Sequence, residues 1–508
     1  MPPFHDPDVT RLDQPPAHAT PTARADTSRT LVFAACMMAT FMAAVESTIV
    51  ATAMPSIVAH LGGFELLAWV FSAYLLAQAV TIPLYGRLAD LYGRKRVFFA
   101  GAGLFLVGSA LSGLAPSMPM LVGFRVAQGF GAGAVLPIAY TIVGDIYTPA
   151  ERARVQGVLS GVWGVAAVVG PPLGAFLVEL DWRLVFWINL PIGGAAIAMI
   201  AAFLREPRHN QSQRIDLAGA ALLAMGLGAV VLSAGQSERI GAAAAAVLLG
   251  LGVVALALLV VWERRTATPM LPLQLFTERV MVAGCLGGFT IGALMMSITA
   301  FLPTYIQAGM GRSPMVAGLV LGAMSIIWAF ASVAAGRLML WTSYRVAGIV
   351  GALALLAGCA MLIAMTPQAG PVWAAFGASA VGIGMGFCNT TFLVSVQAHV
   401  RWRQRGVATS AAMSMRMTGQ SLGAAVSGAI LDVGLARLSA SSPDPVDRLL
   451  NPVTRGAMPV AELERLVQAV AGSLQNVYLL SAALALATLA LALGLPAALS
   501  PRHQSARE

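Results

Sequence analysis

The sequence predicts an all-α integral membrane protein with 14 transmembrane helices, arranged as two six-helix halves with an inserted helix pair between them. Three observations predict this class. Of the 508 residues, 58% are hydrophobic and only 10% are charged, whereas a soluble domain carries about 25% charged residues. Apolar stretches of about 20 residues, the length that crosses a hydrocarbon core about 30 Å thick, recur along the chain. Glycine patterns also recur at one offset near 250 residues.

The predicted spans alternate with short polar or basic turns. Their expected ranges are 31–58, 67–89, 97–115, 119–143, 155–177, 184–203, 215–235, 241–262, 280–307, 314–338, 345–366, 371–397, 406–434 and 474–497.

These spans divide the chain into parts with distinct expected roles. Residues 1–30 are rich in Pro, Thr and Arg and are expected to be a disordered tail. The first apolar span is too long for the apolar core of a signal peptide, so it should remain as the first helix. The remaining expected parts are an N-terminal bundle (31–203), an inserted helix pair (215–262), a C-terminal bundle (280–497) with an outer loop (437–473), and a second tail (498–508).

The basic residues predict how the chain lies in the membrane. Most Lys and Arg outside the spans fall on the side of the two termini, for example Arg94, Lys95 and Arg96. Because cytoplasmic loops are enriched in Lys and Arg, both termini should be cytoplasmic in a cell (inner) membrane. The same rule accounts for the net charge of +9 without a nucleic-acid partner.

The outer loop 437–473 contains a segment with helical periodicity. Val460, Leu463, Val467 and Val470 repeat at helical spacing. This predicts a short amphipathic helix on the outer rim, with a lid over the substrate as the alternative.

Three glycine patterns indicate an internal repeat. Residues 129–133 (GFGAG) recur as 382–386 (GIGMG), Gly86-Arg87-Leu88 recurs as 336–338, and the pair Gly170 and Gly174 recurs as 419 and 423. Duplicated halves moving about a central site are a transporter architecture.

Metal, cofactor and enzyme chemistry are not expected. Cys36, Cys285, Cys359 and Cys388 lie inside apolar spans without metal-ligand spacing. No P-loop or nucleophile–base constellation is evident. We therefore expect no enzyme activity, no cofactor and a monomer.

Glu46 is an acid within the first apolar span, where a charge costs about 2.5–3.5 kcal/mol on insertion scales and usually marks a function. At 1.5 Å per residue, Glu46 lies roughly 22 Å along its span, and Arg125 lies roughly 9 Å along a span of opposite direction. Both therefore fall at a similar depth, and a contact is predicted. The residues leave two interpretations open: a proton-exchanging carboxylate tuned by Arg125, or a fixed ion pair that only holds helices.

The turn after the second span has an ordered motif, GRLADLYGRKR, over residues 86–96. Gly86 and Gly93 allow tight approach of helix ends, while Asp90 can pair with Arg94 or face a helix N-terminus. Such a charge cluster can lock one face of a transporter. The motif resembles the most specific signature of the major facilitator superfamily.

Further motifs resemble the branch of fourteen-span drug:proton antiporters, and the resemblance implies a major-facilitator-type fold. Arg125-x-x-Gln128-Gly129 is similar to the fourth-helix motif, whose Arg takes part in proton coupling. Gly170-Pro171-Pro172-Leu173-Gly174 is similar to the exporter motif, which favours export over uptake. Residues 181–193 and 46–55 match the same branch. The resemblance further implies that Asp145, with Arg152 nearby, joins the lock of Asp90 and Arg94.

The second half departs from these motifs. The counterpart of Asp90 is Leu340 and that of Gly93 is Ser343. By the same offsets, Arg125 corresponds to Ala378 and Glu46 to about Met296. The proton chemistry is therefore expected in the first half alone.

Polar residues within spans are the candidate substrate contacts, although helix packing is the alternative for each. For Arg416 the alternatives are lining a cavity or anchoring to carbonyls. These candidates are Gln128, Gln307, Asn389 and Arg416.

The expected function is export of hydrophobic or cationic small molecules against proton influx, giving multidrug efflux and antibiotic resistance. Its expected partners are a small-molecule substrate, protons and the lipid bilayer. A dedicated exporter of an endogenous metabolite or lipid is the alternative, and uptake by proton symport is a further one.

Overall fold

The computed structural model describes residues 23–147, 149–206, 216–266, 276–400, 405–439, 445–495 and 497, all the regular structure of which is helical. The expected tails 1–30 and 498–508 lie largely outside these residues. The helices of the first part are α1 (Ala23–Leu61), α2 (Leu67–Tyr92), α3 (Arg94–Gly113), α4 (Met118–Ile146), α5 (Pro149–Leu180), α6 (Leu184–Trp187) and α7 (Asn189–Phe203).

The chain continues through a long hairpin and a second set of helices. These are α8 (Leu217–Arg265), α9 (Arg279–Thr304), α10 (Pro314–Trp341), α11 (Tyr344–Ile363), α12 (Gly370–His399), α13 (Arg405–Ser439), α14 (Pro445–Leu450), α15 (Pro452–Gly456) and α16 (Val460–Leu493). Short elements η1 (Phe64–Leu66), η3 (Tyr305–Gly309) and η4 (Pro367–Ala369) lie between them.

Among the described residues, 12 helical segments are long and apolar enough to cross a membrane. The predicted spans 155–177 and 406–434 are helical, on α5 and α13, but fall outside this set. On α5 the apolar stretch is Gly164–Leu180, which is shorter than the spans of this set. The chain is therefore a multi-pass membrane protein.

The predicted spans 215–235 and 241–262 form the two limbs of α8. Gly241 turns the chain with φ 79° and ψ 154°, a conformation that favours glycine. The hydroxyl of Ser233 donates to the carbonyl of Ala245 at 2.8 Å across the turn. At the opposite end, the indole N–H of Trp262 donates to the Asp216 carboxylate at 2.8 Å. These bonds join the limbs into an antiparallel hairpin.

The segment after residue 460 differs from its prediction. It is helical, but it forms the first turns of a continuous 34-residue helix, α16, instead of a separate helix on the rim. Gly472 is its one glycine, and a single glycine costs a helix only about 1 kcal/mol relative to alanine. Nothing in the sequence therefore ends the helix between 460 and 493.

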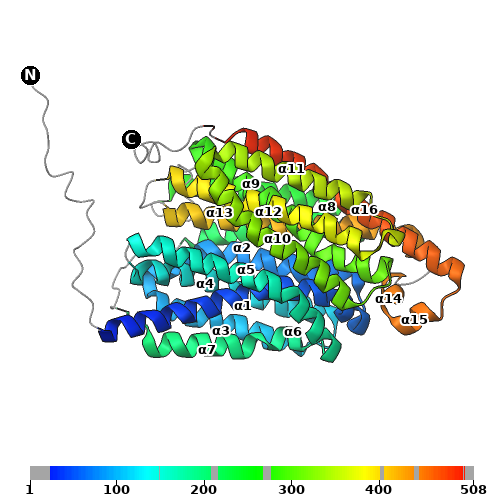
Figure 1. The fold of residues 1–508 in the computed structure, drawn as a ribbon, viewed down its shortest axis with the longest axis horizontal. Coiled ribbons are helices and arrows are strands. Elements are labelled where there is room, and N and C mark those ends of the chain that lie inside the picture. Colours follow the sequence, from blue (N-terminus) through cyan, green and yellow to red (C-terminus); the bar gives the residue numbers. More distant parts are fainter. Residues whose placement is uncertain are drawn as a thin grey trace, which may run out of the picture.

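The long helices pack as two groups, which Figure 1 shows one beside the other. The first group comprises α1–α7, and the second comprises α9–α13 with α16. The start of α1 and the end of α16 lie at one end of the bundle, here called the terminal end. The opposite end, which carries α14 and α15, is called the cap end.

The repeated glycines make matching contacts in the two groups. A Cβ on Gly129 of α4 would lie 2.3 Å from the carbonyl oxygen of Tyr74, and one on Gly382 of α12 would lie 2.3 Å from that of Met324. Similarly, Gly131 faces the backbone of α3, and Gly384 faces α11. Because only glycine permits this approach, the glycine pattern sets how closely these helices pack.

The two groups meet mainly through α2 with α13 and α5 with α10. Ser72 of α2 and Ser421 of α13 each donate a hydroxyl to the other's carbonyl oxygen at 2.8 Å. Farther along the same helices, Ser414 donates to the carbonyl of Ala79 at 2.9 Å. Between α10 and α5, a Cβ on Gly318 would lie 2.8 Å from the carbonyl oxygen of Pro171.

Candidate functional site

Glu46 and Arg125 form a buried ion pair between α1 and α4. The guanidinium Nη1 of Arg125 contacts Oε1 of Glu46. Glu46 is 0% exposed and Arg125 is 2% exposed. The contact predicted from their equal depth is present, although it lies within the first group and not between the two groups.

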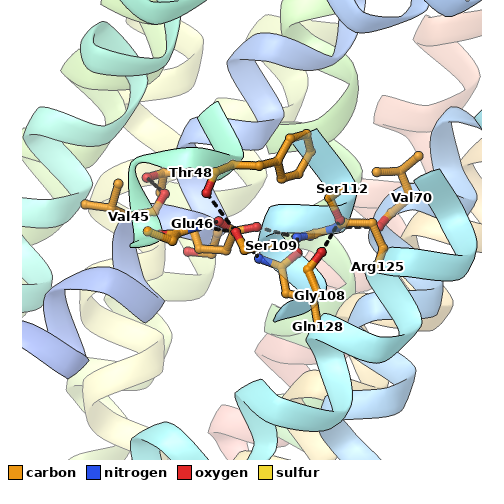
Figure 2. Close-up of polar contacts among 12 residues, drawn as sticks. Val45, Glu46, Thr48, Val70, Gly108, Ser109, Ser112, Arg125 and Gln128 are labelled. Carbon is orange, nitrogen blue, oxygen red and sulfur yellow. Dashed lines mark hydrogen bonds and ion pairs between the residues drawn. The ribbon is translucent and has the colours of Figure 1, made fainter. Parts of the chain in front are cut away.

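Three further side chains close a hydrogen-bonded ring with this pair. Nη1 of Arg125 also donates to Oε1 of Gln128 at 2.6 Å, and Nε2 of Gln128 donates to Oγ of Ser109 at 3.1 Å. Nδ2 of Asn189 donates to Oε2 of Glu46 and, at 3.0 Å, to Ser109. The charge centre, defined as Glu46, Ser109, Arg125, Gln128 and Asn189, thus joins α1, α3, α4 and α7; Figure 2 shows its first four members converging.

The surrounding packing holds the charge centre in place. A Cβ on Gly108 would lie 2.5 Å from the backbone nitrogen of Gln128, so glycine lets α3 approach α4 closely. The hydroxyl of Ser109 donates onward to the carbonyl of Phe186 at 2.8 Å. Among the described residues, none of the five residues of the charge centre has a buried side-chain nitrogen or oxygen without a hydrogen-bond partner, as is usual for buried polar groups.

Arg125 also contacts α2. Its Nε donates to the carbonyl oxygen of Val70 at 3.3 Å. Its Cζ lies 4.0 Å from the ring centroid of Tyr74, within the range of a cation–π interaction. A single guanidinium therefore links α4 to both α1 and α2.

Gln128 belongs to this centre, although the sequence placed it among the substrate contacts. It is 0% exposed, and both ends of its amide are bonded within the ring. In this arrangement Gln128 orients Arg125.

A second charged cluster lies at the terminal end, around the motif of residues 86–96. Arg94 forms an ion pair with Asp145 of α4. The Glu206 carboxylate accepts from the backbone nitrogens of Arg94 at 2.7 Å and Lys95 at 3.0 Å. It therefore caps the N-terminus of α3, where the helix dipole favours an anion. The Lys95 ammonium of α3 also donates to the carbonyls of Ala201 and Leu204, at the end of α7, each at 2.8 Å.

Gly93 is required at the turn into α3. Its φ is +90°, and a Cβ there would lie 2.8 Å from the Glu206 carboxylate. A Cβ on Gly86, by contrast, would meet nothing within 4 Å. Asp90 and Arg152 lie on α2 and α5, but their side chains are outside the described residues.

The glycines and proline of the exporter-like motif place α5 between α1 and α10. A Cβ on Gly170 would lie 2.0 Å from Oγ1 of Thr48, and one on Gly174 would lie 2.7 Å from the carbonyl of Ile49. On the other side, the carbonyl of Pro171 faces Gly318. This motif therefore shapes the contact of α5 with both groups.

The three other substrate candidates lie apart from the charge centre. Arg416 packs beside Gly288 and Gly292 of α9. Asn389 is half-buried on α12. Gln307 lies in the π-helix η3, and its Nε2 is buried without a hydrogen-bond partner among the described residues.

Several residues of these two charged clusters were not predicted from the sequence. No functional role was assigned to Ser109, Tyr74 or Glu206, and Asn189 was included only as part of a motif. A polar side chain inside an apolar span was the available signal for Ser109 and Asn189. Glu206 carried no comparable signal, because it lies beyond the predicted span 184–203.

Among the described residues, no group of His, Cys, Asp or Glu could hold a metal ion. The four cysteines are free and buried. The charge centre instead places one carboxylate against one guanidinium in the interior of the first group.

Comparison with known proteins supports the membrane architecture. A family model described as Major Facilitator Superfamily matches residues 36–424. The chain is 31% identical to "Multidrug resistance protein 3" of Bacillus subtilis (strain 168), over 91% of this chain and 94% of that protein. It is 32% identical to "Multidrug transporter protein MdtP" of the same organism, over 80% of this chain and 75% of that protein.

A solved structure shares the fold. It is described as a bacterial homolog to human lysosomal transporter, Spinster, in an inward-facing and unoccupied conformation. It superposes with a TM-score of 0.66 at 16% identity, covering 92% of this chain and 96% of that chain.

Proposed function

Because the chain belongs to the major facilitator superfamily, we propose that this transporter exports hydrophobic or cationic small molecules in exchange for protons, by alternating access. The observation that carries the proposal is the charge centre. A carboxylate with no exposed surface, held by an arginine inside a membrane helix, is costly and usually functional. The names of the two Bacillus relatives support multidrug efflux as the role.

We assign the chain to the fourteen-span drug:proton antiporter branch. We place it in a cell (inner) membrane with both termini on the cytoplasmic side. The 12 apolar segments already include the two limbs of α8 as separate spans, and the helices α5 and α13 bring the number to fourteen. The first and second groups are then the two halves, α8 is the inserted pair, and the monomer is the working unit. The common position of the start of α1 and the end of α16 supports this topology.

With the terminal end in the cytoplasm, the cap end is the outer side of the transporter. The serine pair Ser72 and Ser421 and the approach of Gly318 to Pro171 close the halves toward the cap end. In an exporter, substrate would enter from the terminal end.

The residues take the following roles in the proposal. Glu46 exchanges the proton, and Arg125 stabilises its ionised form. A neutral Glu46 leaves a buried guanidinium without its anion, which favours a different packing of the first half. Gly86, Asp90, Gly93, Arg94, Asp145 and Arg152 form the cytoplasmic lock, and Gly170, Pro171 and Gly174 set the export-type contact between halves. Gln307, Asn389 and Arg416 contact the substrate.

The test is efflux from cells that express the wild type or Glu46→Gln, with and without an uncoupler that collapses the proton gradient. The probes are a lipophilic cationic dye and a neutral hydrophobic dye. We expect the wild type to export in a gradient-dependent manner and Glu46→Gln to lose this export. Glu179→Gln is the control, because Glu179 is exposed near the end of α5. Full gradient-driven export by Glu46→Gln contradicts the proposal.

The range of exported compounds tests the substrate class separately. A panel of chemically unrelated dyes and drugs should include several exported compounds. Export of one compound alone would instead indicate a dedicated exporter of an endogenous metabolite or lipid.

A further inference from the structure

The α2 helix stands between the charge centre and the contact of the two groups. Val70 and Tyr74 are four residues apart and so share one face of the helix, where both contact Arg125. Ser72 lies between them in sequence and points to the opposite side, where it bonds to Ser421 of α13. The segment 70–74 of α2 therefore contacts both the charge centre, through Arg125, and the second group, through Ser421.

The contacts with α2 depend on the charge of Glu46. Arg125 is 2% exposed, and its charge is satisfied by Glu46, Gln128, the Val70 carbonyl and the Tyr74 ring. When Glu46 is neutral, the guanidinium loses its one anionic partner in this set. The carbonyl and the ring face of α2 then supply a larger share of its stabilisation, because a buried charge needs compensation.

The α2 helix is packed too tightly against α4 to absorb such a change locally. A Cβ on Gly129 would lie 2.3 Å from the Tyr74 carbonyl, and one on Gly133 would lie 2.0 Å from Oγ1 of Thr81. Interiors packed at this density transmit small displacements instead of absorbing them. A shift of Val70 or Tyr74 therefore reaches Ser72.

We propose that the α2 segment 70–74 transmits the charge state of Glu46 to the Ser72–Ser421 contact, with Tyr74 as the positioning residue. This inference rests on the proposed function for its biological role, because that function supplies the proton. Ionised Glu46 favours the closed serine contact, and neutral Glu46 favours its opening. Tyr74 acts through Arg125 and does not itself exchange the proton.

The experiment measures the separation of the two groups directly, without transport. Spin labels are placed at Leu114, which directly follows the last residue of α3, and at Val433, near the end of α13; both are at least half exposed at the cap end. A second pair, Leu114 with Leu180 at the end of α5, lies within the first group and reports its integrity. The four native cysteines are buried, so labelling can be directed to the introduced sites.

Glu46→Gln should lengthen the Leu114–Val433 distance by more than the width of the wild-type distribution. Adding Tyr74→Met should abolish this response. Methionine fills the space without a ring face, and it is the residue at the matching position 324. Adding Tyr74→Phe, which keeps the ring, should preserve the response, as should the control Tyr85→Leu on the same helix. Tyr74→Leu provides a second ring-free variant if Tyr74→Met does not fold, as judged by the Leu114–Leu180 distance.

The outcomes separate this inference from the proposed function. If Glu46→Gln lengthens the distance equally with and without the Tyr74 ring, the inference is wrong even where proton-driven export is lost. An unchanged distance in Glu46→Gln also overturns it. If the response requires the ring but Glu46→Gln still exports fully, the inference holds and the proposed function is wrong.

Discussion

Tyr74 and Met324 occupy matching positions in the two helix groups: the carbonyl oxygen of each lies against a glycine, Gly129 in α4 and Gly382 in α12. The Tyr74 ring lies on the Arg125 guanidinium, whereas the second group has Ala378 at the position of that arginine. The backbone contacts therefore match in the two groups, whereas at these positions the interaction of an aromatic ring with an arginine is present only in the first.

The same offsets extend this asymmetry to three further residues of the charge centre. Gly108 packs against Gln128, and Gly358 packs against Val381 in the corresponding place. The residue after each glycine is Ser109 in the first group and Cys359 in the second. Glu46 corresponds approximately to Met296. The positions of Glu46, Ser109, Arg125 and Gln128 therefore each have an apolar counterpart in the second group. This pattern supports proton chemistry in the first half only.

Replacing Asn189 tests whether the ring orients the carboxylate. Asn189→Ala removes the donor to Oε2 of Glu46, and a buried polar group without a partner costs about 1–3 kcal/mol. We expect gradient-driven dye export to fall about tenfold, which corresponds to about 1.4 kcal/mol. Asn476→Ala, at an exposed position of α16, is the control. Unchanged export by Asn189→Ala would mean that Glu46 needs no donor at Oε2.

Arg125→Lys tests the geometry of the cation at constant charge. Lysine has a compact ammonium and cannot reproduce the planar guanidinium that contacts Glu46, Gln128 and the Val70 carbonyl together. Export should fall at least about tenfold, while the amount of folded protein changes little. The control is Arg183→Lys, because the side chain of Arg183 is 42% exposed and pairs locally with Asp181. Wild-type export by Arg125→Lys would show that charge alone is sufficient.

The glycine contacts predict differences in stability. A Cβ on Gly131 would lie 2.2 Å from the backbone nitrogen of Phe105, so Gly131→Ala should destabilise the protein by about 1–3 kcal/mol through overpacking. Gly384→Ala should have a similar effect in α12, where the Gly351 carbonyl lies 2.7 Å away. Thermal unfolding in detergent should show lower Tm values for both. Gly123→Ala meets nothing within 4 Å and should leave the Tm unchanged; equal Tm values for all three variants would contradict the packing argument.

Glu206→Ala tests the cap on α3. Loss of an N-terminal cap costs about 0.5–2 kcal/mol, and here the carboxylate accepts from two backbone N–H groups. We expect a lower Tm than for the matched variant Glu179→Ala on α5. If the two variants unfold at the same temperature, the carboxylate does not stabilise this helix.

Much of the fold could be predicted from the sequence because apolar length and basic turns locate membrane helices well. The ion pair of Glu46 with Arg125 could be predicted in the same way, since depth follows from the rise per residue. The partners Ser109, Asn189 and Tyr74 could not, because depth does not say which way each helix is rotated about its axis. The position of Gln128 within the charge centre could not be predicted for the same reason, because its burial depends on the face of α4 that meets α3.

The continuous helix α16 shows a different limit. The first turns of α16 are polar and were therefore predicted to belong to the outer loop 437–473. Hydropathy locates the boundary of the membrane, which need not coincide with the end of a helix. The helix continues past that boundary, from 460 to 493, since no proline interrupts it.

The central claim, proton exchange at Glu46, is tested most directly in proteoliposomes with a pH-sensitive dye trapped inside. Addition of an exported cationic dye under an imposed pH gradient should cause proton movement through the wild type, in the direction opposite to the substrate. The account predicts that Glu46→Gln abolishes this substrate-dependent proton movement, while Glu179→Gln retains it. Substrate-dependent proton movement of wild-type size through Glu46→Gln would contradict the account.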